Sequence, residues 1–137
     1  MPARILDGKT LAQDLRQQIA RRAAALRARN TPVKLDAVLA CSGGDAASRV
    51  YAENQARLCR DLGIDYELHE LPPGVGADAI AAQIERLNDD PAVRAIMVHL
   101  PLPDGVDTYK IQSLIAPDKD VEGVNPANIG NIVYGRS

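Results

Sequence analysis

Tryptophan and phenylalanine are absent from the 137-residue sequence, and four tyrosines are its only aromatic side chains. A hydrophobic core must therefore be built from aliphatic side chains and alanine. The sequence has only two cysteines and two histidines and no C-x-x-C motif. This leaves little basis for a metal centre, and it fits small buried thiols in a reducing compartment. We expect no metal cofactor.

The sequence also lacks an excess of charge of either sign, since 18 acidic residues nearly balance 16 basic ones. Such a chain has no strong field to hold nucleic acid or an anionic membrane, so we expect neither as a partner. No run approaches the roughly 20 apolar residues of a membrane span. The first residues lack a signal-peptide pattern. These absences favour a single cytoplasmic domain with a core of its own.

What is present is an alternation of apolar strands and amphipathic helices. Apolar spacing predicts helices over residues 10–29, 45–62, 77–88 and 108–116, and strands over 35–41, 64–71 and 95–98. The alternation predicts an α/β fold, with a three-layer, mostly parallel sheet flanked by helices.

The polarity of individual segments predicts where they lie in the fold. The runs 35–41 and 95–98 are continuously apolar and are predicted to be central, whereas 64–71 alternates in polarity and is predicted to lie nearer an edge. The stripe Leu11–Ile19 is predicted to pack into the core. Residues 117–126 are rich in turn formers and predict an irregular loop.

A glycine-rich turn, Ser42–Gly44, joins the first strand to the second helix. Asp45 or Ser48 is predicted to cap this helix. Tyr51 and Gln55 are four residues apart, so they share one face of it. Together with the strand exit at 99–103 and the loop at 118–125, this helix is expected to line a cleft at the carboxyl edge of the sheet.

Four ordered blocks make the pattern specific: DAASRVY at 45–51, LGI at 62–64, VHLPLP at 98–103 and PDKDVEG at 117–123. The opening ILDGK and the closing NPANIG fit the same pattern. With these blocks the chain resembles the bifunctional methylenetetrahydrofolate dehydrogenase/methenyltetrahydrofolate cyclohydrolase family. The resemblance implies the family's amino-terminal folate-binding (catalytic) domain over 1–137, with an amino-acid-dehydrogenase-like fold.

The resemblance stops at Ser137, where the family's NADP-binding Rossmann domain would begin, and the chain has no G-x-G-x-x-G element. We therefore expect NADP to act only through a second domain, separate or downstream. The chain itself is expected to be a monomer or a weak homodimer. The activity implied is one-carbon folate metabolism, which feeds purine biosynthesis: 5,10-methylenetetrahydrofolate is oxidised to the methenyl form, which is hydrolysed to 10-formyltetrahydrofolate.

The resemblance also implies a set of site residues. Tyr51 would stack on the folate, and Glu122 would bond the pterin where the family has an aspartate. The Leu100–Pro101 bond is expected to be cis. The catalytic candidates are Tyr51, Gln55 and His99; the substrate-binding candidates are Tyr51, Ala52, Glu53, Asn54, Gln55, Val98, His99, Leu100, Pro101 and Glu122.

Besides Glu122, two positions depart from the family. Gln55 stands where the family has a lysine, and His99 where it has a glutamine. Glutamine cannot titrate, so the cyclohydrolase step is expected to be impaired. One hypothesis is that the two chemical types have exchanged places: the Gln55 amide lies within about 2.7–3.2 Å of one His99 nitrogen, or one water apart, and orients it, while the other nitrogen serves as proton acceptor.

The alternatives are simple loss of function, a non-catalytic folate-binding or scaffold module, and a similar domain recruited to another amino-acid-dehydrogenase-like enzyme. Elsewhere, His69, Lys119 and Asp120 are expected to be surface or loop-fixing residues.

Overall fold

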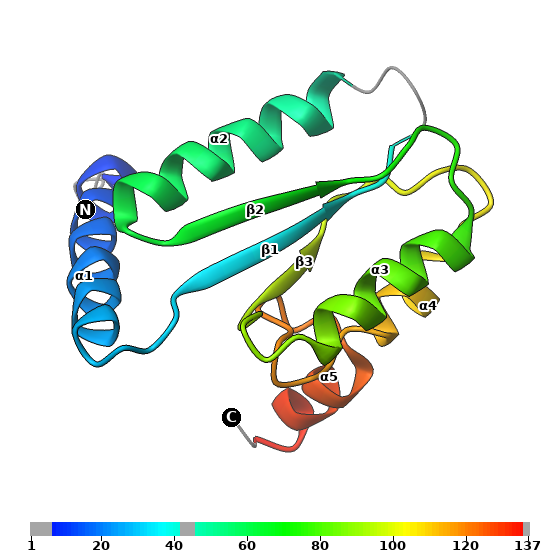
Figure 1. Cartoon of the computed structure of the whole chain (residues 1–137). Helices are drawn as coiled ribbons and strands as arrows, with labels where there is room; N and C mark the ends of the chain where they lie inside the picture. The colour runs from blue at the N-terminus through cyan, green and yellow to red at the C-terminus, as the bar shows by residue number, and fades with distance from the viewer. Residues whose placement is uncertain (1–6, 42–45, 136–137) are drawn as a thin grey trace, which may run out of the picture.

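The computed structural model describes residues 7–41 and 46–135 (Figure 1). Helices and strands alternate along the chain, as the apolar spacing predicts. The elements in chain order are α1 (Gly8–Ala28), β1 (Lys34–Leu39), α2 (Ala46–Leu62), β2 (Asp65–Glu70), α3 (Ala77–Asp89), β3 (Ile96–Val98), α4 (Thr108–Ser113) and α5 (Pro126–Val133).

The strands form a parallel sheet in the order β2-β1-β3. This confirms the central place of β1 and the edge place of β2. The prediction that 95–98 is central is wrong, because within the described residues β3 pairs with β1 on one side and has only an isolated bridge, Ile96 to Asp120, on the other. Its apolar character reflects cover on both faces rather than strands on both edges.

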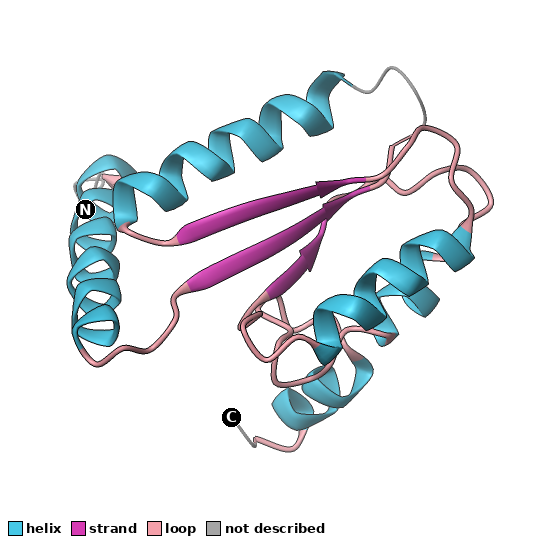
Figure 2. Ribbon diagram, in the orientation of Figure 1, coloured by secondary structure: helices cyan, strands magenta, loops and turns pink. Residues whose placement is uncertain are grey.

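The sheet is the middle of three layers, which confirms the predicted class (Figure 2). Helix α2 covers one face, and α3 with α4 covers the other. The main core lies under α3, where a cluster of aliphatic side chains is almost fully buried: Val38, Ala40, Ile80, Ile84, Leu87, Val93, Ile96, Val98, Leu102, Ile111 and Ile115. Each large member contributes roughly 1.5–3 kcal/mol of burial free energy, so this layer fixes β1 and β3 in place.

Alternation along the strands sends two different sets of side chains to the two faces. Val38 belongs to the core under α3, and Asp36, two residues earlier, points to that same face. Glu67 and His69 on β2 are in register with Asp36 and Val38 and share their face. Tyr66, between Asp65 and Glu67, therefore lies on the face that α2 covers.

The predicted core stripe of α1 is wrong. Leu11, Leu15 and Ile19 are 61%, 48% and 40% exposed, and Ala23 is the helix's one buried residue. The physical reason is position: α1 lies beyond the amino ends of the strands and packs on α2 instead of covering a face (Figure 1). No helix in the described ranges is long and apolar enough to cross a membrane.

Helix α5 was missed by the sequence pattern, which gave an irregular segment up to Pro126. Its start does have a local signal: the Asn125 side chain accepts from the Ala127 amide at 2.8 Å, and Pro126 takes the first turn, where no amide hydrogen is needed. At the start of α2, Ser48 lies inside the helix and is not its cap, whereas the Ser42–Gly44 turn and Asp45 lie outside the described residues.

Candidate functional site

A pocket of about 350 Å³ opens where β3 ends. Tyr51 enters it from α2, Val98 and His99 from the end of β3, and Glu122 from the loop before α5. The complete lining is Tyr51, Met97, Val98, His99, Leu100, Gln112, Glu122 and Val124. Five of the predicted site residues, Tyr51, Val98, His99, Leu100 and Glu122, therefore meet around one hollow at the carboxyl edge of the sheet.

His99 is buried beside this pocket and is fixed on both sides. Its backbone N–H donates to the Val38 carbonyl at 2.9 Å, which extends the ladder past β3. Its ring meets Tyr51 edge to face, with centroids 5.7 Å apart and planes at 80°. Its Nε2 lies 3.1 Å from the Tyr66 hydroxyl. Burial lowers the pKa of His99, so the ring is neutral at physiological pH.

Glu122 brings a carboxylate to the same pocket. Burial, and then the nearby Asp120 charge, raise the pKa of Glu122. Asp120 itself fixes the loop, because it accepts from the backbone amides of Glu122 at 3.2 Å and Asn125 at 2.8 Å. A carboxylate whose charge is disfavoured in this way gains most from a ligand that supplies hydrogen-bond donors.

The exit of β3 closes the pocket rim. The Leu100–Pro101 peptide bond is cis, as predicted. The Ser48 hydroxyl donates to the Leu100 carbonyl at 3.4 Å and so ties the first turns of α2 to this exit. Leu100 itself is about half exposed and is available to a ligand.

The remaining predicted residues lie elsewhere. Ala52 is fully buried, Glu53 and Pro101 are exposed, and none of the three lines the described hollows. Asn54 lines a second, shallower hollow with Ala47, Val50 and Tyr51. Tyr51 therefore borders both hollows.

Gln55 does not make the contact with His99 that the exchange hypothesis requires. Its Oε1 is buried with no hydrogen-bond partner among the described residues, and the Nε2 of His99 is taken by Tyr66. The predicted direct hydrogen bond between Gln55 and His99 is therefore wrong. His99 does face Tyr51 and the pocket, as that hypothesis expected.

Sequence reasoning missed Tyr66, Gln112 and Val124. Tyr66 is 33 residues from His99, and β1 lies between their strands, so no spacing rule connects them. Gln112 could have been found, because it is the one amide in the short helix that follows the Pro101–Pro103 exit. Met97 was overlooked because it was assigned to the core.

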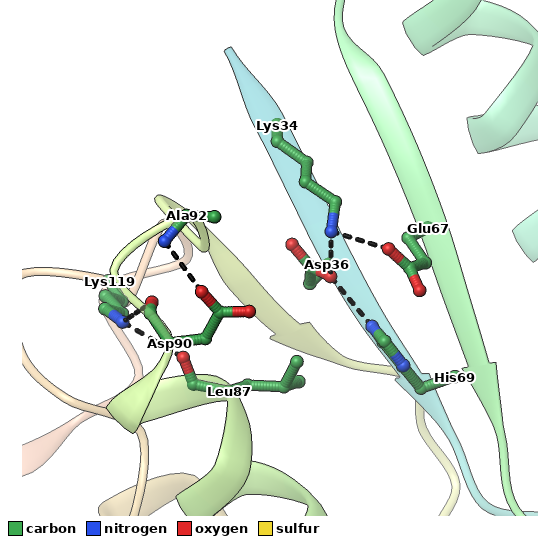
Figure 3. A network of polar contacts seen from close by, with 8 residues as sticks. All are labelled: Lys34, Asp36, Glu67, His69, Leu87, Asp90, Ala92 and Lys119. Atoms are coloured by element: carbon green, nitrogen blue, oxygen red, sulfur yellow. Dashed lines mark hydrogen bonds and ion pairs between the residues drawn. The ribbon is translucent and has the colours of Figure 1, made fainter. Parts of the chain in front are cut away.

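A second polar cluster lies on the other face of the sheet (Figure 3). Asp36 is 0% exposed, and its Oδ1 accepts from Lys34 Nζ at 3.0 Å and from His69 Nε2 at 2.8 Å. Lys34 also donates to Glu67 at 2.5 Å. The prediction that His69 is a surface or loop-fixing residue is wrong, since it is half-buried and bonds to a buried carboxylate.

This cluster has the donor types of a metal site, because ligand atoms of Asp36, Glu67 and His69 lie within 4.8 Å of one another. The Lys34 ammonium, however, already lies between the two carboxylates. Burial alone would lower the pKa of Lys34, but hydrogen bonds to Glu67 and Asp36 outweigh it and raise the pKa. The chain thus supplies its own counter-ion at this place.

Lys119 caps α3 with a third set of polar contacts (Figure 3). Its ammonium donates to the carbonyls of Leu87 at 3.0 Å, Asn88 at 2.6 Å and Asp90 at 2.8 Å. Together with Asp120 it holds the 117–125 segment, which confirms the loop-fixing role expected of both residues.

Comparison with known proteins gives this geometry a context. Residues 6–122 match the family model described as tetrahydrofolate dehydrogenase/cyclohydrolase, catalytic domain. The bifunctional protein FolD of Moorella thermoacetica is 42% identical over 135 residues, covering 98% of this chain and 48% of the relative. Bifunctional protein FolD 1 of Rubrobacter xylanophilus is 41% identical, covering 97% and 46%. The chain thus spans about half the length of the curated relatives it matches.

Solved structures agree with the sequence comparison. The bifunctional FolD methylenetetrahydrofolate dehydrogenase/cyclohydrolase from Campylobacter jejuni superposes with a TM-score of 0.90 at 30% identity, over 96% of this chain and 46% of that one. The Trypanosoma brucei enzyme, solved with NADP cofactor and inhibitor, superposes with a TM-score of 0.86 at 28% identity, over 100% and 47%. The similarity again covers less than half of each longer chain.

Proposed function

The chain belongs to the tetrahydrofolate dehydrogenase/cyclohydrolase family, and from this membership we propose that the pocket beside Tyr51 binds a reduced folate that carries a one-carbon unit. The observation that carries the proposal is the convergence of Tyr51, His99 and Glu122 from three separate segments on one hollow. A flat heterocycle can stack on the tyrosine ring while its adjacent N–H groups donate to the carboxylate.

The chemistry divides between binding and proton transfer. In this proposal Tyr51 and Glu122 bind and orient 5,10-methylene- or 5,10-methenyltetrahydrofolate as substrate. Gln55 has no titrating group, so it cannot carry the proton transfers that hydrolysis of the methenyl bridge requires. The cyclohydrolase step is therefore slow in this chain. We assign NADP, which accepts the hydride in the dehydrogenase step, to a second domain and to none of the described residues.

Calorimetric titration with tetrahydrofolate under anaerobic conditions tests the binding proposal. We expect saturable binding to the wild-type chain and a loss of affinity of roughly 10- to 150-fold in Glu122→Gln, which removes a charged hydrogen-bond acceptor. Glu53→Gln is the matched control, because Glu53 is exposed on α2 and lines none of the described hollows. Absence of binding by the folded wild-type chain would overturn the proposal, and so would equal losses in the two variants.

A second candidate is a non-catalytic folate-binding or scaffold module, which the unpartnered amide oxygen of Gln55 favours. Gln55→Lys separates the two. If the chain is an enzyme domain with an impaired step, this variant gains hydrolysis of 5,10-methenyltetrahydrofolate, followed by the loss of its absorbance. If folate binds equally well to both forms and neither hydrolyses it, the scaffold function holds.

A further inference from the structure

Tyr66 is the residue whose contact the sequence gave no reason to expect. It lies on β2, and β1 separates this strand from β3 (Figure 1). Its hydroxyl nevertheless lies 3.1 Å from His99 Nε2. No other hydrogen-bond partner of this hydroxyl occurs among the described residues. Which of the two groups donates in this hydrogen bond therefore decides which ring nitrogen of His99 carries the proton.

Counting protons gives the direction. Burial is the largest cause that raises the pKa of Tyr66, to about 12, so the hydroxyl keeps its proton at physiological pH. If Nε2–H donated to the tyrosine oxygen, the tyrosine's own proton would be left without an acceptor in a half-buried place, which is costly. If the tyrosine donates to Nε2, both atoms of this contact are satisfied, and the donor left over is Nδ1–H of His99, a residue that lines the pocket. A neutral imidazole carries one proton, which must then be on Nδ1.

We propose that Tyr66 is a positioning residue for His99: its hydroxyl donates to Nε2, holds the neutral ring in the Nδ1–H tautomer, and leaves Nδ1–H as the hydrogen-bond donor for a ligand in the pocket. His99 lines the pocket, and Nε2 is the one ring nitrogen with a partner in the described structure. Tyr51 packs edge to face against the same ring and limits its rotation.

This assignment changes the chemistry available at the site. A histidine locked in this way presents a donor and is a poor proton acceptor, because its basic nitrogen is already engaged. The ligand atom it meets must be an acceptor, such as a carbonyl oxygen or an unprotonated ring nitrogen. Glu122, which lines the same pocket, presents an acceptor, so the pocket selects a ring that carries both hydrogen-bond donors and an acceptor. The assignment of the His99 tautomer does not depend on a ligand. The inference that the ligand presents an acceptor to Nδ1–H rests on the proposed function.

Nitrogen NMR of the chain labelled with ¹⁵N-histidine tests the tautomer directly, since protonated and unprotonated ring nitrogens have well-separated shifts. The chain has only two histidines, and the other is an internal reference of opposite type. His69 Nε2 lies 2.8 Å from Asp36 Oδ1, a carboxylate oxygen that only accepts, so His69 is expected in the Nε2–H form.

We expect His99 in the Nδ1–H form in the ligand-free wild-type chain at pH 8. In Tyr66→Phe, which keeps the ring, the Nδ1–H to Nε2–H ratio of His99 should fall roughly 2- to 12-fold, the equivalent of one neutral hydrogen bond. His69 should not change. A wild-type His99 in the Nε2–H form overturns the proposal, as does a ratio that Tyr66→Phe leaves unaltered. The wild-type measurement decides even if the variant fails to fold.

Adding tetrahydrofolate to the labelled chain then tests the ligand contact. The proposal expects the Nδ1 resonance of His99 to shift while that of His69 stays in place. An Nδ1–H tautomer with no shift on saturation by bound folate overturns the ligand contact and leaves the tautomer assignment standing. No folate binding at all counts against the proposed function and not against Tyr66.

Discussion

The two histidines lie on opposite faces of the same sheet and belong to opposite kinds of network. His69 joins a charged cluster in which the two carboxylates of Asp36 and Glu67 share the ammonium of Lys34 (Figure 3). His99 joins a neutral group of rings with Tyr51 and Tyr66. One network holds two strands together by charge, and the other borders a pocket.

The difference shows what separates a structural polar cluster from a candidate site. In the charged cluster the Lys34 ammonium lies between the carboxylates of Asp36 and Glu67, and the Oδ2 of Asp36, which has no partner among the described residues, is buried, so a ligand would have to displace Lys34. In the neutral group one nitrogen of His99 has no partner in the described residues, and a hollow lies beside it. Unused hydrogen-bonding capacity next to open space is the better guide to function than a concentration of charge.

The comparison predicts that the charged network is the more costly one to break. Asp36→Ala removes a fully buried carboxylate and leaves Lys34 and His69 without their shared acceptor. We expect the free energy of unfolding to fall by about 3 kcal/mol, because partly buried cationic and polar groups lose their counter-charge. Urea unfolding followed by circular dichroism measures this. A loss below about 1 kcal/mol would mean that the cluster is no more structural than a surface ion pair.

Lys119 tests whether charge alone sets the cost. It donates to three carbonyls at the end of α3 and has no carboxylate partner in the described contacts. Lys119→Met keeps the aliphatic stem, and we expect it to lower the free energy of unfolding by about 2 kcal/mol, as charged hydrogen bonds to helix-terminal carbonyls are lost. Lys110→Met on α4 is the control, because its exposed side chain makes none of these contacts. Equal effects would remove the capping role of Lys119.

The neutral network should be cheaper to break at neutral pH. Tyr66→Phe loses one hydrogen bond, and we expect about 1 kcal/mol of destabilisation near pH 7. At high pH the stability advantage of the wild type over Tyr66→Phe should shrink. Burial raises the pKa of Tyr66 in the folded chain to about 12, from the ordinary tyrosine value of about 10, so the stability that depends on the protonated hydroxyl is lost as the pH rises through this interval.

The urea midpoints of the wild type and Tyr66→Phe should therefore approach each other between pH 10 and pH 12. Phenylalanine has no ionisable proton, so the variant reports how pH affects the stability of the chain without titration at position 66. Midpoints that stay equally far apart over this interval would show that the Tyr66 hydroxyl is not in a desolvated place.

The smallest effect is expected at the rim of the charged network. Glu67 also bonds to Lys34, but its side chain is about half exposed. Glu67→Gln should change the free energy of unfolding by less than about 1 kcal/mol, and added salt should shrink the difference further. A loss equal to that of Asp36→Ala would show that exposure does not separate the two carboxylates.

Periodicity in the sequence was sufficient to predict the layers and most element bounds, because each helix or strand reports locally which of its faces is apolar. It could not predict the place of β3 in the sheet. A strand such as 96–98 that is covered on both faces is equally apolar at an edge or in the centre, so composition does not reveal its neighbours. The α1 stripe failed for a related reason, since an apolar face does not say what covers it.

The site was predictable in part. Segments that follow the carboxyl ends of parallel strands meet at one edge of the sheet, and the predicted residues lie on such segments: Tyr51, His99, Leu100 and Glu122. Tyr66 was not predictable, because its contact depends on side-chain reach across β1. Gln55 was misplaced because sharing a helix face with Tyr51 does not ensure a hydrogen-bond partner on the next element.

The edge strand β2 has a consequence for how copies of this chain behave at high concentration. Its acids are each paired with a base from a different element: Asp65 with Arg27, Glu67 with Lys34 and Glu70 with Arg49. A foreign strand that tried to pair with β2 would have to strip water from this row of ions. Exposed strand edges otherwise recruit further strands and start aggregates. At moderate ionic strength β2 therefore resists edge-to-edge growth, and acidification, which protonates the carboxylates and leaves the bases unpaired, should expose it to that growth.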